Sequence, residues 1–472
     1  MAEKLNASRA GAIERGHAYL DSGLFERDLA RRVAIPTESQ VARSLPHLRR
    51  YQSEEMRPSF EAMGFTCEIF QNPVEGCGPV LLATRIEPGG GPTVLGYGHG
   101  DVIRGLEDQW SKGAGPWQTA RDGDKLYGRG TADNKGQHSI NMGALRAVIE
   151  ERGYLGFNAK VMIEMGEENG SRGVWDIIAG NKEAFSADVF IGSDGPRVSQ
   201  ESPTMSLGAR GAQNFDLICE LREGGHHSGN WGGALTDPAI VLAHAISVIT
   251  SPTGEILVPE WRPPALSQEV REALALVTLD GGASGPEINP DWGEPGLTSS
   301  ENVYAWNSFA VLAMKAGNPE HPVNAIAPWA RAHCQLRYIA GTNRDDILPA
   351  LQRHFDNYGI NGVTIAPPPP GNAAGFNASR TELDHPWADW VRGSLARTTN
   401  SQISVIPQTG GSICNDLFTD LLQIPAIWVP HSYPGCQQHA PDEHILMSLS
   451  RNAIELMTGL YWDLGQGKTP SQ

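Results

Sequence analysis

The chain has 472 residues, of which 40% are hydrophobic, and its formal net charge is −17. This length predicts two domains, or one large domain with an insertion. The acidic charge, without a run of Lys or Arg, argues against a nucleic-acid-binding protein, and the lack of a stretch of about 18 apolar residues argues against a membrane-spanning protein.

The first 207 residues alternate short apolar strands with helices. The spacing of apolar residues predicts helices at 14–31, 46–63, 136–152 and 174–181, and strands at 66–70, 80–86, 93–97, 159–165 and 187–191. This alternation is typical of an α/β sheet whose faces are covered by helices.

The pattern changes near Gly208, where the strands begin to alternate between apolar and polar residues. Strands are predicted at 214–221, 303–314 and 330–339, helices at 238–250 and 344–358, and an irregular insertion rich in Pro, Gly and Trp at 252–300. Residues 367–375 look like a connection back, followed by a helix at 385–397 and a strand at 426–429. We therefore expect an α+β unit over residues 208–380, inserted into a domain made of residues 1–207 and 381–472.

Charged side chains gather where the predicted strands of the first domain end. They are His99 and Asp101 after strand 93–97, Glu167 and Glu168 after 159–165, Asp194 after 187–191, and His439 after 426–429. The carboxyl ends of strands form the edge of an open α/β sheet where ligands bind. Asp133, just before the helix at 136–152, is predicted to lie near the same edge. Taken singly, each residue is explained as well by a loop, a turn or a helix cap, and His431 and His444 compete with His439; only the joint pattern indicates a site.

The adjacent carboxylates Glu167 and Glu168 repel each other unless one binds a cation or one holds a proton. Two solvated surface acids are the alternative. The nitrogen and oxygen donors, without cysteine, suit zinc, cobalt or manganese. They are too many for one catalytic zinc but suffice for two ions that share a carboxylate. Glu167 is then left as the general base, and Asp101 as the residue that orients His99 through its second ring nitrogen.

Five segments, in order and spread over nearly the whole chain, resemble the dinuclear zinc aminoacylase and carboxypeptidase family. That family includes acetylornithine deacetylase, succinyl-diaminopimelate desuccinylase and carnosine dipeptidase. The segments are Gly98-His-Gly-Asp-Val102, Leu126-Tyr-Gly-Arg-Gly-Thr-Ala-Asp-Asn-Lys-Gly136, Met165-Gly-Glu-Glu-Asn-Gly-Ser171, Ser193-Asp-Gly195 and Gln438-His-Ala-Pro-Asp-Glu443.

The resemblance implies a zinc-peptidase-like catalytic domain with a helix-covered mixed sheet and an inserted α+β lid, which commonly mediates dimerisation. We therefore expect a homodimer. Two divalent ions are implied, with zinc expected and cobalt or manganese as alternatives. Their implied ligands are Asp133 to both ions, His99 and Asp194 to one, and Glu168 and His439 to the other. Glu167 would deprotonate the water that bridges the ions and later protonate the leaving amine. A cis peptide bond after Asp133 is also implied.

The same comparison implies roles for four residues outside the metal set. His227, directly before Ser228-Gly229, matches better than His226 the lid histidine that reaches a partner's active site and stabilises the oxyanion. Asn324 resembles a lid asparagine with a similar role. Arg337 and Ser412 resemble residues that bind the substrate's free carboxylate, although a surface role is the alternative for Arg337.

Two departures from the family pattern concern the substrate. Cys414 stands where a proline often follows Gly-Gly-Ser-Ile, and Gln137 with His138 is an unusual pair after the bridging aspartate. Both changes are expected to border the substrate side of the site. They therefore bear on the identity of the substrate more than on the metal chemistry.

These features predict a metal-dependent hydrolase that cleaves an amide bond next to a free carboxylate. The long lid with its Trp-rich insertion resembles the dipeptidase branch of the family more than the compact deacetylases, which implies a dipeptidase or carboxypeptidase acting on a dipeptide. An amidohydrolase acting on N-acyl amino acids is the alternative within the class. A metal-bearing binding protein without turnover is the alternative outside it, and Glu167 argues against that. A serine hydrolase is not supported, because no Gly-X-Ser-X-Gly motif is present.

The cysteines and the first residues bear on the compartment. The six cysteines lie far apart without a Cys-X-X-Cys pair, and the first residues lack the basic and apolar segments of a signal peptide. We therefore expect a cytoplasmic protein with reduced thiols that binds neither nucleic acid nor a membrane.

Overall fold

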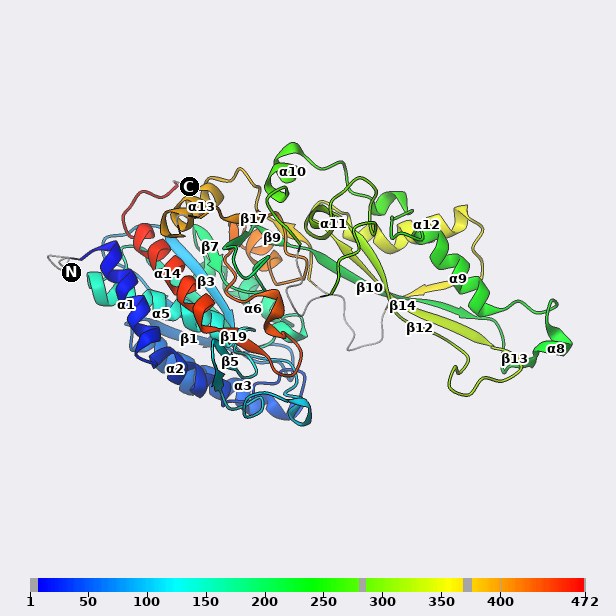
Figure 1. Ribbon diagram of the computed structural model, residues 1–472, viewed down its shortest axis with the longest axis horizontal. Helices are drawn as coiled ribbons and strands as arrows, with labels where there is room; N and C mark the ends of the chain where they lie inside the picture. Colours follow the sequence, from blue (N-terminus) through cyan, green and yellow to red (C-terminus); the bar gives the residue numbers. More distant parts are fainter. Residues whose placement is uncertain (1–6, 280–285, 368–375, 400, 471–472) are drawn as a thin grey trace.

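The computed structural model describes residues 7–279, 286–367, 376–399 and 401–470. It has a larger lobe built on a sheet with helices on both sides, and a smaller lobe that projects from it and carries a second sheet (Figure 1). The predicted α/β fold with an α+β insertion is confirmed.

The main sheet has eight strands in the order β1-β2-β6-β3-β7-β18-β8-β17. They are β1 (Thr66–Phe70), β2 (Val80–Arg85), β6 (Asn158–Glu164), β3 (Thr93–His99), β7 (Val189–Gly192), β18 (Ala426–Trp428), β8 (Thr204–Ser206) and β17 (Ser404–Ile406). The four central strands, β6, β3, β7 and β18, run parallel to one another, whereas β1, β2 and β8 make antiparallel pairs. The sheet is therefore mixed, with one shared carboxyl edge at its centre.

Successive side chains of a strand point to opposite faces of a sheet. In this sheet the side chains on both faces are buried, each face in its own hydrophobic cluster. In β6, Val161 and Ile163 belong to one hydrophobic cluster and Met162 to another. Elements of the first cluster include α1 (Arg9–Asp21), α2 (Leu24–Val33), α3 (Leu45–Arg50), α4 (Arg57–Glu61), α5 (Lys135–Arg152), α13 (Pro386–Thr399) and α14 (Met447–Leu464). Those of the second include α6 (Val174–Gly180), α7 (Lys182–Phe185) and a π-helical turn at Leu417–Leu421. A three-stranded sheet of β4 (Ala120–Asp122), β5 (Lys125–Tyr127) and β19 (His444–Leu446) lies beside them.

The smaller lobe, which we call the lid, is a four-stranded antiparallel sheet with helices packed on one face. Its strands are β12 (Ser308–Ala316), β14 (Trp329–Tyr338), β10 (Gly211–Glu220) and β15 (Thr364–Ala366). Its hydrophobic core joins β10 and β14 to α9 (Pro238–Ile249) and α12 (Ile347–Asn357). The far end of the lid carries β11 (His226–His227), α8 (Ser228–Trp231) and β13 (Ala325–Ile326) (Figure 1). The insertion between its helices holds α10 (Gln268–Leu274) and α11 (Ser299–Tyr304).

The chain leaves and re-enters the main lobe at one place. Strand β9 (Gly208–Ala209) pairs antiparallel with β16 (Ser379–Arg380). The two crossings therefore lie side by side, which lets the lid be inserted without disturbing the main sheet. Most of the predicted connection at 367–375 lies outside the described residues.

Three local predictions differ from the structure. The helix predicted at 14–31 is two helices, because Gly23 adopts a φ of 72° between them. The segment predicted as a strand from residue 303 begins as helix α11, which starts at a capping box formed by Thr298 and Glu301. Helix α14 was not predicted; it is buried along most of its length and so lacks a clear polar face. Within the described residues, no helix is long and apolar enough to cross a membrane.

Candidate metal centre

The carboxyl ends of the central parallel strands bring the predicted ligands together. His99 is the last residue of β3, Asp194 comes two residues after β7, and Glu168 follows β6 in a short 3-10 turn at Glu167–Asn169. His439 lies in the chain after β18, before β19. Asp133 comes two residues before α5, and the peptide bond after it is cis, as the resemblance implied.

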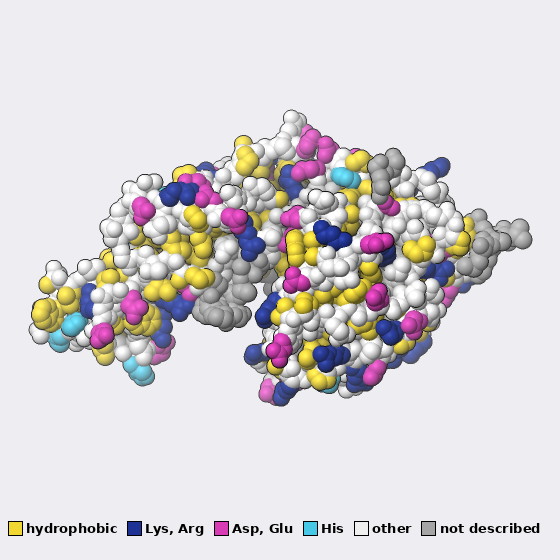
Figure 2. Space-filling model, turned by 180° about the vertical axis from the view of Figure 1, so that it is seen from behind, with side chains coloured by type: hydrophobic (Ala, Val, Ile, Leu, Met, Phe, Trp, Pro, Cys, Tyr) yellow, Lys and Arg dark blue, Asp and Glu magenta, His cyan; other side chains and the backbone are white. Residues whose placement is uncertain are grey.

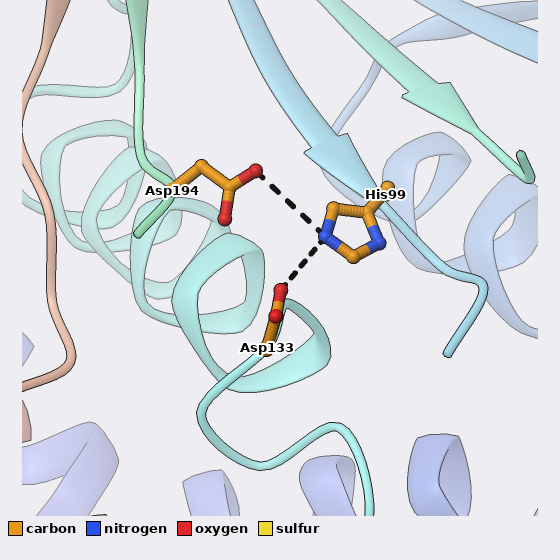
Figure 3. Close-up of side chains that lie close together, drawn as sticks. All are labelled: His99, Asp133 and Asp194. Carbon is orange, nitrogen blue, oxygen red and sulfur yellow. Dashed lines mark hydrogen bonds and ion pairs between the residues drawn. The ribbon is translucent and has the colours of Figure 1, made fainter. Parts of the chain in front are cut away.

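Two groups of potential ligands share Asp133. One group is His99, Asp133 and Asp194, and the other is Asp133, Glu168 and His439; in each, one ligand atom per residue lies within 4.8 Å of the others. His99 Nε2 lies 2.9 Å from Asp133 Oδ1 and 3.8 Å from Asp194 Oδ2, and its ring points between the two carboxylates (Figure 3).

His439 completes the second group on the other oxygen of Asp133. Its Nε2 lies 3.2 Å from Asp133 Oδ2 and 3.1 Å from Glu168 Oε2. The Asp133 carboxylate thus presents one oxygen to each group, which is the arrangement expected of a residue that bridges two cations. The donors are imidazole nitrogens and carboxylate oxygens without cysteine, a set that suits zinc, cobalt or manganese. The residues therefore fit a pair of divalent cations.

Asp101 supports both the histidine and the glutamate pair. The backbone N–H groups of Glu167 and Glu168 donate to its two carboxylate oxygens, each at 3.2 Å. His99 Nδ1 lies 3.0 Å from the backbone oxygen of Asp101 and 3.4 Å from its carboxylate. The second ring nitrogen of His99 therefore faces Asp101, with the backbone carbonyl as the nearer partner.

Burial and neighbouring charges shift the pKa values of the candidate ligands and of Glu167. Hydrogen bonds to Asp133 and Glu168 raise the pKa of His439 to about 11. Burial raises the pKa of Glu168 to about 7 and that of Asp194 to about 6. Burial, with the nearby carboxylates, also raises the pKa of Glu167 well above its usual value.

Cation binding should therefore displace protons from this centre. Metal ligands bind as neutral imidazole and as carboxylate. Because the pKa values of His439 and Glu168 are raised, these groups hold protons near neutral pH, so the affinity for zinc should fall as pH is lowered from 8 to 6. Calorimetric titration of metal-free protein with zinc, in two buffers of different ionisation enthalpy, measures the protons released. Equal heats in both buffers would contradict the expectation.

Two buried residues lie beneath the centre: Asn134, which was not singled out from the sequence, and His138, which was expected to border the substrate side. The Asn134 side chain donates to Asp194 Oδ1 at 3.1 Å and to the Ser193 carbonyl at 2.8 Å, so it orients a candidate ligand. His138 lies 3.2 Å from the Asn134 side-chain oxygen and 2.8 Å from the Tyr51 hydroxyl. His138 is thus buried behind the centre and does not border a substrate side. Cys414 is likewise fully buried, in the hydrophobic cluster on one face of the main sheet.

Glu443 holds the loop that carries Asp133. Its Oε1 accepts hydrogen bonds from the backbone N–H groups of Gly130, Ala132 and Asp133 at 2.9–3.0 Å. Its Oε2 accepts from Arg129 at 2.8 Å, and both side chains are 1% exposed. The sequence offered one signal: Glu443 ends the same motif, starting at Gln438, that contains His439. This carboxylate therefore positions the residue shared by both ligand groups.

Replacing Glu443 with Gln should weaken metal binding as well as folding. The amide has one acceptor oxygen, so it cannot accept from both the backbone N–H groups and Arg129. Arg129 is also left buried without its charge partner, which typically costs about 3–5 kcal/mol. Metal affinity should fall about 10–100-fold, as for other residues that orient ligands. Urea unfolding and zinc titration measure the two effects.

Asp463→Asn is the matched control for Glu443→Gln. Asp463 is a buried carboxylate on α14 that accepts from Arg9, Ser394 and Arg397. This variant should lose stability but keep its metal affinity. Equal metal affinity in the Glu443 variant and the wild type would contradict a positioning role.

Two arginines donate hydrogen bonds to a main-lobe loop that contains Gly410 and Ser412. Arg337 on β14 donates from Nη1 to Ser412 Oγ at 2.7 Å, so the two predicted carboxylate-binding residues are in contact. Arg210 donates from Nε and Nη2 to the Gly410 carbonyl at 3.1 and 2.9 Å. Arg210 was not singled out from the sequence, where it is an isolated arginine between strands.

The structure places His227 and Asn324 away from this cluster. His227 is exposed on β11, which pairs with β13, and the backbone oxygen of Asn324 accepts from Ser228 N at 2.9 Å. The two residues are therefore close to each other at the far end of the lid, whereas the candidate ligands lie at the main sheet (Figure 1). Within one chain they do not join the centre.

Comparison with known proteins agrees with this geometry. The cysteinylglycine-S-conjugate dipeptidase of Corynebacterium striatum is 28% identical over 300 residues, which cover 61% of this chain and 63% of that protein. The beta-Ala-His dipeptidase of Mus musculus is 28% identical over 277 residues, 54% of each chain. The chain thus spans between half and two thirds of the length of these relatives.

The fold has close structural counterparts. The crystal structure of human carnosine dipeptidase 1 matches with a TM-score of 0.78 at 20% identity, covering 98% of this chain and 99% of that one. Residues 95–463 match the sequence pattern of peptidase family M20/M25/M40. The match spans more than half of the chain, includes all five candidate metal ligands and agrees with the family resemblance of the motifs: the chain belongs to peptidase family M20/M25/M40.

Proposed function

We propose that this protein is a metal-dependent dipeptidase that uses two divalent cations, with zinc as the expected metal. The observation that carries the proposal is the Asp133 carboxylate, which presents Oδ1 to His99 and Oδ2 to His439. Two cations bound there would act as Lewis acids on the scissile carbonyl and on the attacking water. The relatives reported above are dipeptidases, which favours a dipeptide over an N-acyl amino acid as the substrate.

Glu167 is the proposed general base and acid. It is held beside the ligands through its backbone N–H, which donates to Asp101. Burial and the neighbouring carboxylates favour its protonated form, so nearby positive charge is needed for it to accept a proton. In the reaction its carboxylate takes a proton from the attacking water and passes it to the amine that leaves.

Arg337 and Ser412 are the proposed binding site for the substrate's free carboxylate. The guanidinium group can donate two parallel hydrogen bonds to a carboxylate, and the contact with Ser412 places it beside the loop after Gly410. A carboxylate bound there fixes one end of the substrate, which restricts cleavage to bonds near a free carboxyl terminus.

Hydrolysis of a defined panel tests the proposal. Metal-free protein is loaded with zinc, cobalt or manganese and offered beta-Ala-His, Cys-Gly, alanine dipeptides and the corresponding N-acetyl amino acids. We expect dipeptides to be cleaved and N-acetyl amino acids to be cleaved slowly or not at all. Cleavage of the N-acetyl compounds alone would replace the dipeptidase by an amidohydrolase, and no cleavage with any metal would contradict the proposal.

We also propose that residues 208–380 form the lid domain and that the protein is a homodimer joined through it. Strand β12 is an edge strand of nine residues whose middle is exposed, and such edges favour pairing with another chain. Exposed apolar side chains of the lid include Trp231, Ile240, Val311, Leu312, Met314, Val323 and Trp329. Figure 2 shows hydrophobic side chains on the surface of this lobe. A dimer would cover them and bring His227 and Asn324 toward a partner's centre.

Mixing two inactive variants tests whether His227 acts across the dimer. His227→Ala should lose oxyanion stabilisation, and Glu167→Gln should lose the base. In a mixed dimer one centre has Glu167 from one chain and His227 from the other, so random exchange should restore about a quarter of wild-type activity. Assays after co-expression measure it.

A third change supplies the control for the mixing experiment. Leu312→Glu, added to both variants, should give monomers by analytical ultracentrifugation and no recovery. Recovery that persists in monomers, or no recovery in confirmed mixed dimers, would contradict a role in trans.

A further inference from the structure

A cavity of about 260 Å³ lies next to the segments that carry the candidate centre. Pro196 and Arg197 in its wall directly follow the Asp194 segment, and Gly410 precedes Ser412 by two residues. Pockets for whole drug-sized ligands span about 300–1,000 Å³. This cavity therefore has room for one part of a substrate, such as a side chain, beside two elements proposed to hold the rest.

Arg197 lines this cavity as a buried cation with no ionic partner among the described residues. Its side chain is 2% exposed, its Nε donates to the Pro430 carbonyl at 3.3 Å, and its Nη2 bonds to no other described residue. Burial lowers the pKa of Arg197 to about 10, and among the described residues no carboxylate counteracts this. The guanidinium group still carries its charge near neutral pH. Because a buried charge is unfavourable unless it is paired, the position is suited to an incoming anion.

Tyr304 adds a second donor to the same wall. It lies in α11 of the insertion, is 9% exposed, and its hydroxyl bonds to none of the described residues. Much of the remaining wall is apolar, with Val198, Leu279 and Ile406. A carboxylate at the end of a short methylene chain matches these surroundings: the methylenes contact the apolar wall while the two donors bind the anion.

This site differs from the proposed site for the terminal carboxylate. Arg337 is already directed at Ser412, and Arg210 is occupied by the Gly410 carbonyl. Arg197 lies in a different segment, three residues after Asp194. We propose that the Arg197 cavity is a substrate subsite for a second carboxylate, so that the preferred dipeptides carry an acidic side chain. This inference rests on the proposed dipeptidase function.

Matched substrate pairs test the subsite. Glu-Ala is compared with Gln-Ala, and Ala-Glu with Ala-Gln, so that each pair exchanges one carboxylate for an amide of the same shape. In the wild type, kcat/KM should favour the Glu member of one pair by about tenfold or more. Arg197→Gln should abolish this preference, Arg197→Lys should keep part of it, and Tyr304→Phe should reduce it.

The control is Arg392→Gln, which removes an arginine on α13 that pairs with exposed Asp389. It should leave the preference unchanged. A purely structural role for Arg197 predicts that Arg197→Gln slows all four substrates equally and lowers Tm. That result, or no preference in the wild type, would overturn the subsite.

Failure of the dipeptidase proposal is a separate outcome. If no dipeptide is cleaved by metal-loaded protein, calorimetry with glutarate tests the cavity directly. Binding in the wild type that is lost in Arg197→Gln would support the anion site without the activity. Equal binding in the two proteins, or none in either, would overturn it.

Discussion

Replacing Glu167 with Gln is expected to abolish hydrolysis while leaving the metal in place. The amide has the shape of the carboxylate but cannot accept the proton of the attacking water, and general acid–base catalysis contributes about 10²–10⁴-fold. Glu167 is not in either group of candidate ligands. We therefore expect kcat/KM for a dipeptide to fall by about this factor with no change in metal content. Steady-state assays and elemental analysis of the dialysed protein measure both quantities.

Two comparisons make the Glu167 result specific. The adjacent Glu168→Gln should lose a ligand, so its activity and its metal content should fall together. Glu183→Gln, on an exposed stretch of α7, should behave as the wild type. Glu167→Ala should resemble Glu167→Gln, because both lack the base. Turnover that is unchanged in the Glu167 variants would remove Glu167 from the mechanism.

Replacing Asp133 with Asn is expected to empty both cation sites. One carboxylate serves His99 on one oxygen and His439 on the other, so its loss of charge acts on both groups. By contrast, Asp194→Asn and His439→Gln each alter one group. Elemental analysis should therefore find close to two zinc ions per chain in the wild type, about one in each of the latter variants, and less than one in Asp133→Asn.

Thermal unfolding provides a second measurement of the Asp133 effect. Zinc at 100 times its dissociation constant stabilises a folded protein by about 2.7 kcal/mol, and this increment should vanish in Asp133→Asn. Asp122→Asn, on the exposed strand β4, is the matched control and should keep it. Two tightly bound ions in Asp133→Asn would show that the cations do not share this carboxylate.

Residues at strand ends were the most predictable part of this molecule. His99, Asp194 and Glu168 follow parallel strands that pair side by side, so their approach follows from strand direction alone. His439 was harder, because His431 and His444 follow the same strand. The structure separates them: His431 is buried against Ser193 and Asn141, and His444 lies beside Tyr433. Of these three histidines, His439 is the one that lies beside Asp133.

The amino-acid sequence alone determined the α/β class, the α+β insertion, the family resemblance and the set of candidate ligands. Each of these follows from the local periodicity of apolar residues or from a short motif. Tertiary structure alone decided what supports and surrounds that set. Glu443 reaches the Asp133 loop across more than 300 residues, Arg197 meets Tyr304 in one cavity, and His227 is held at the far end of the lid. Such contacts depend on how distant elements pack, and no local pattern encodes that packing.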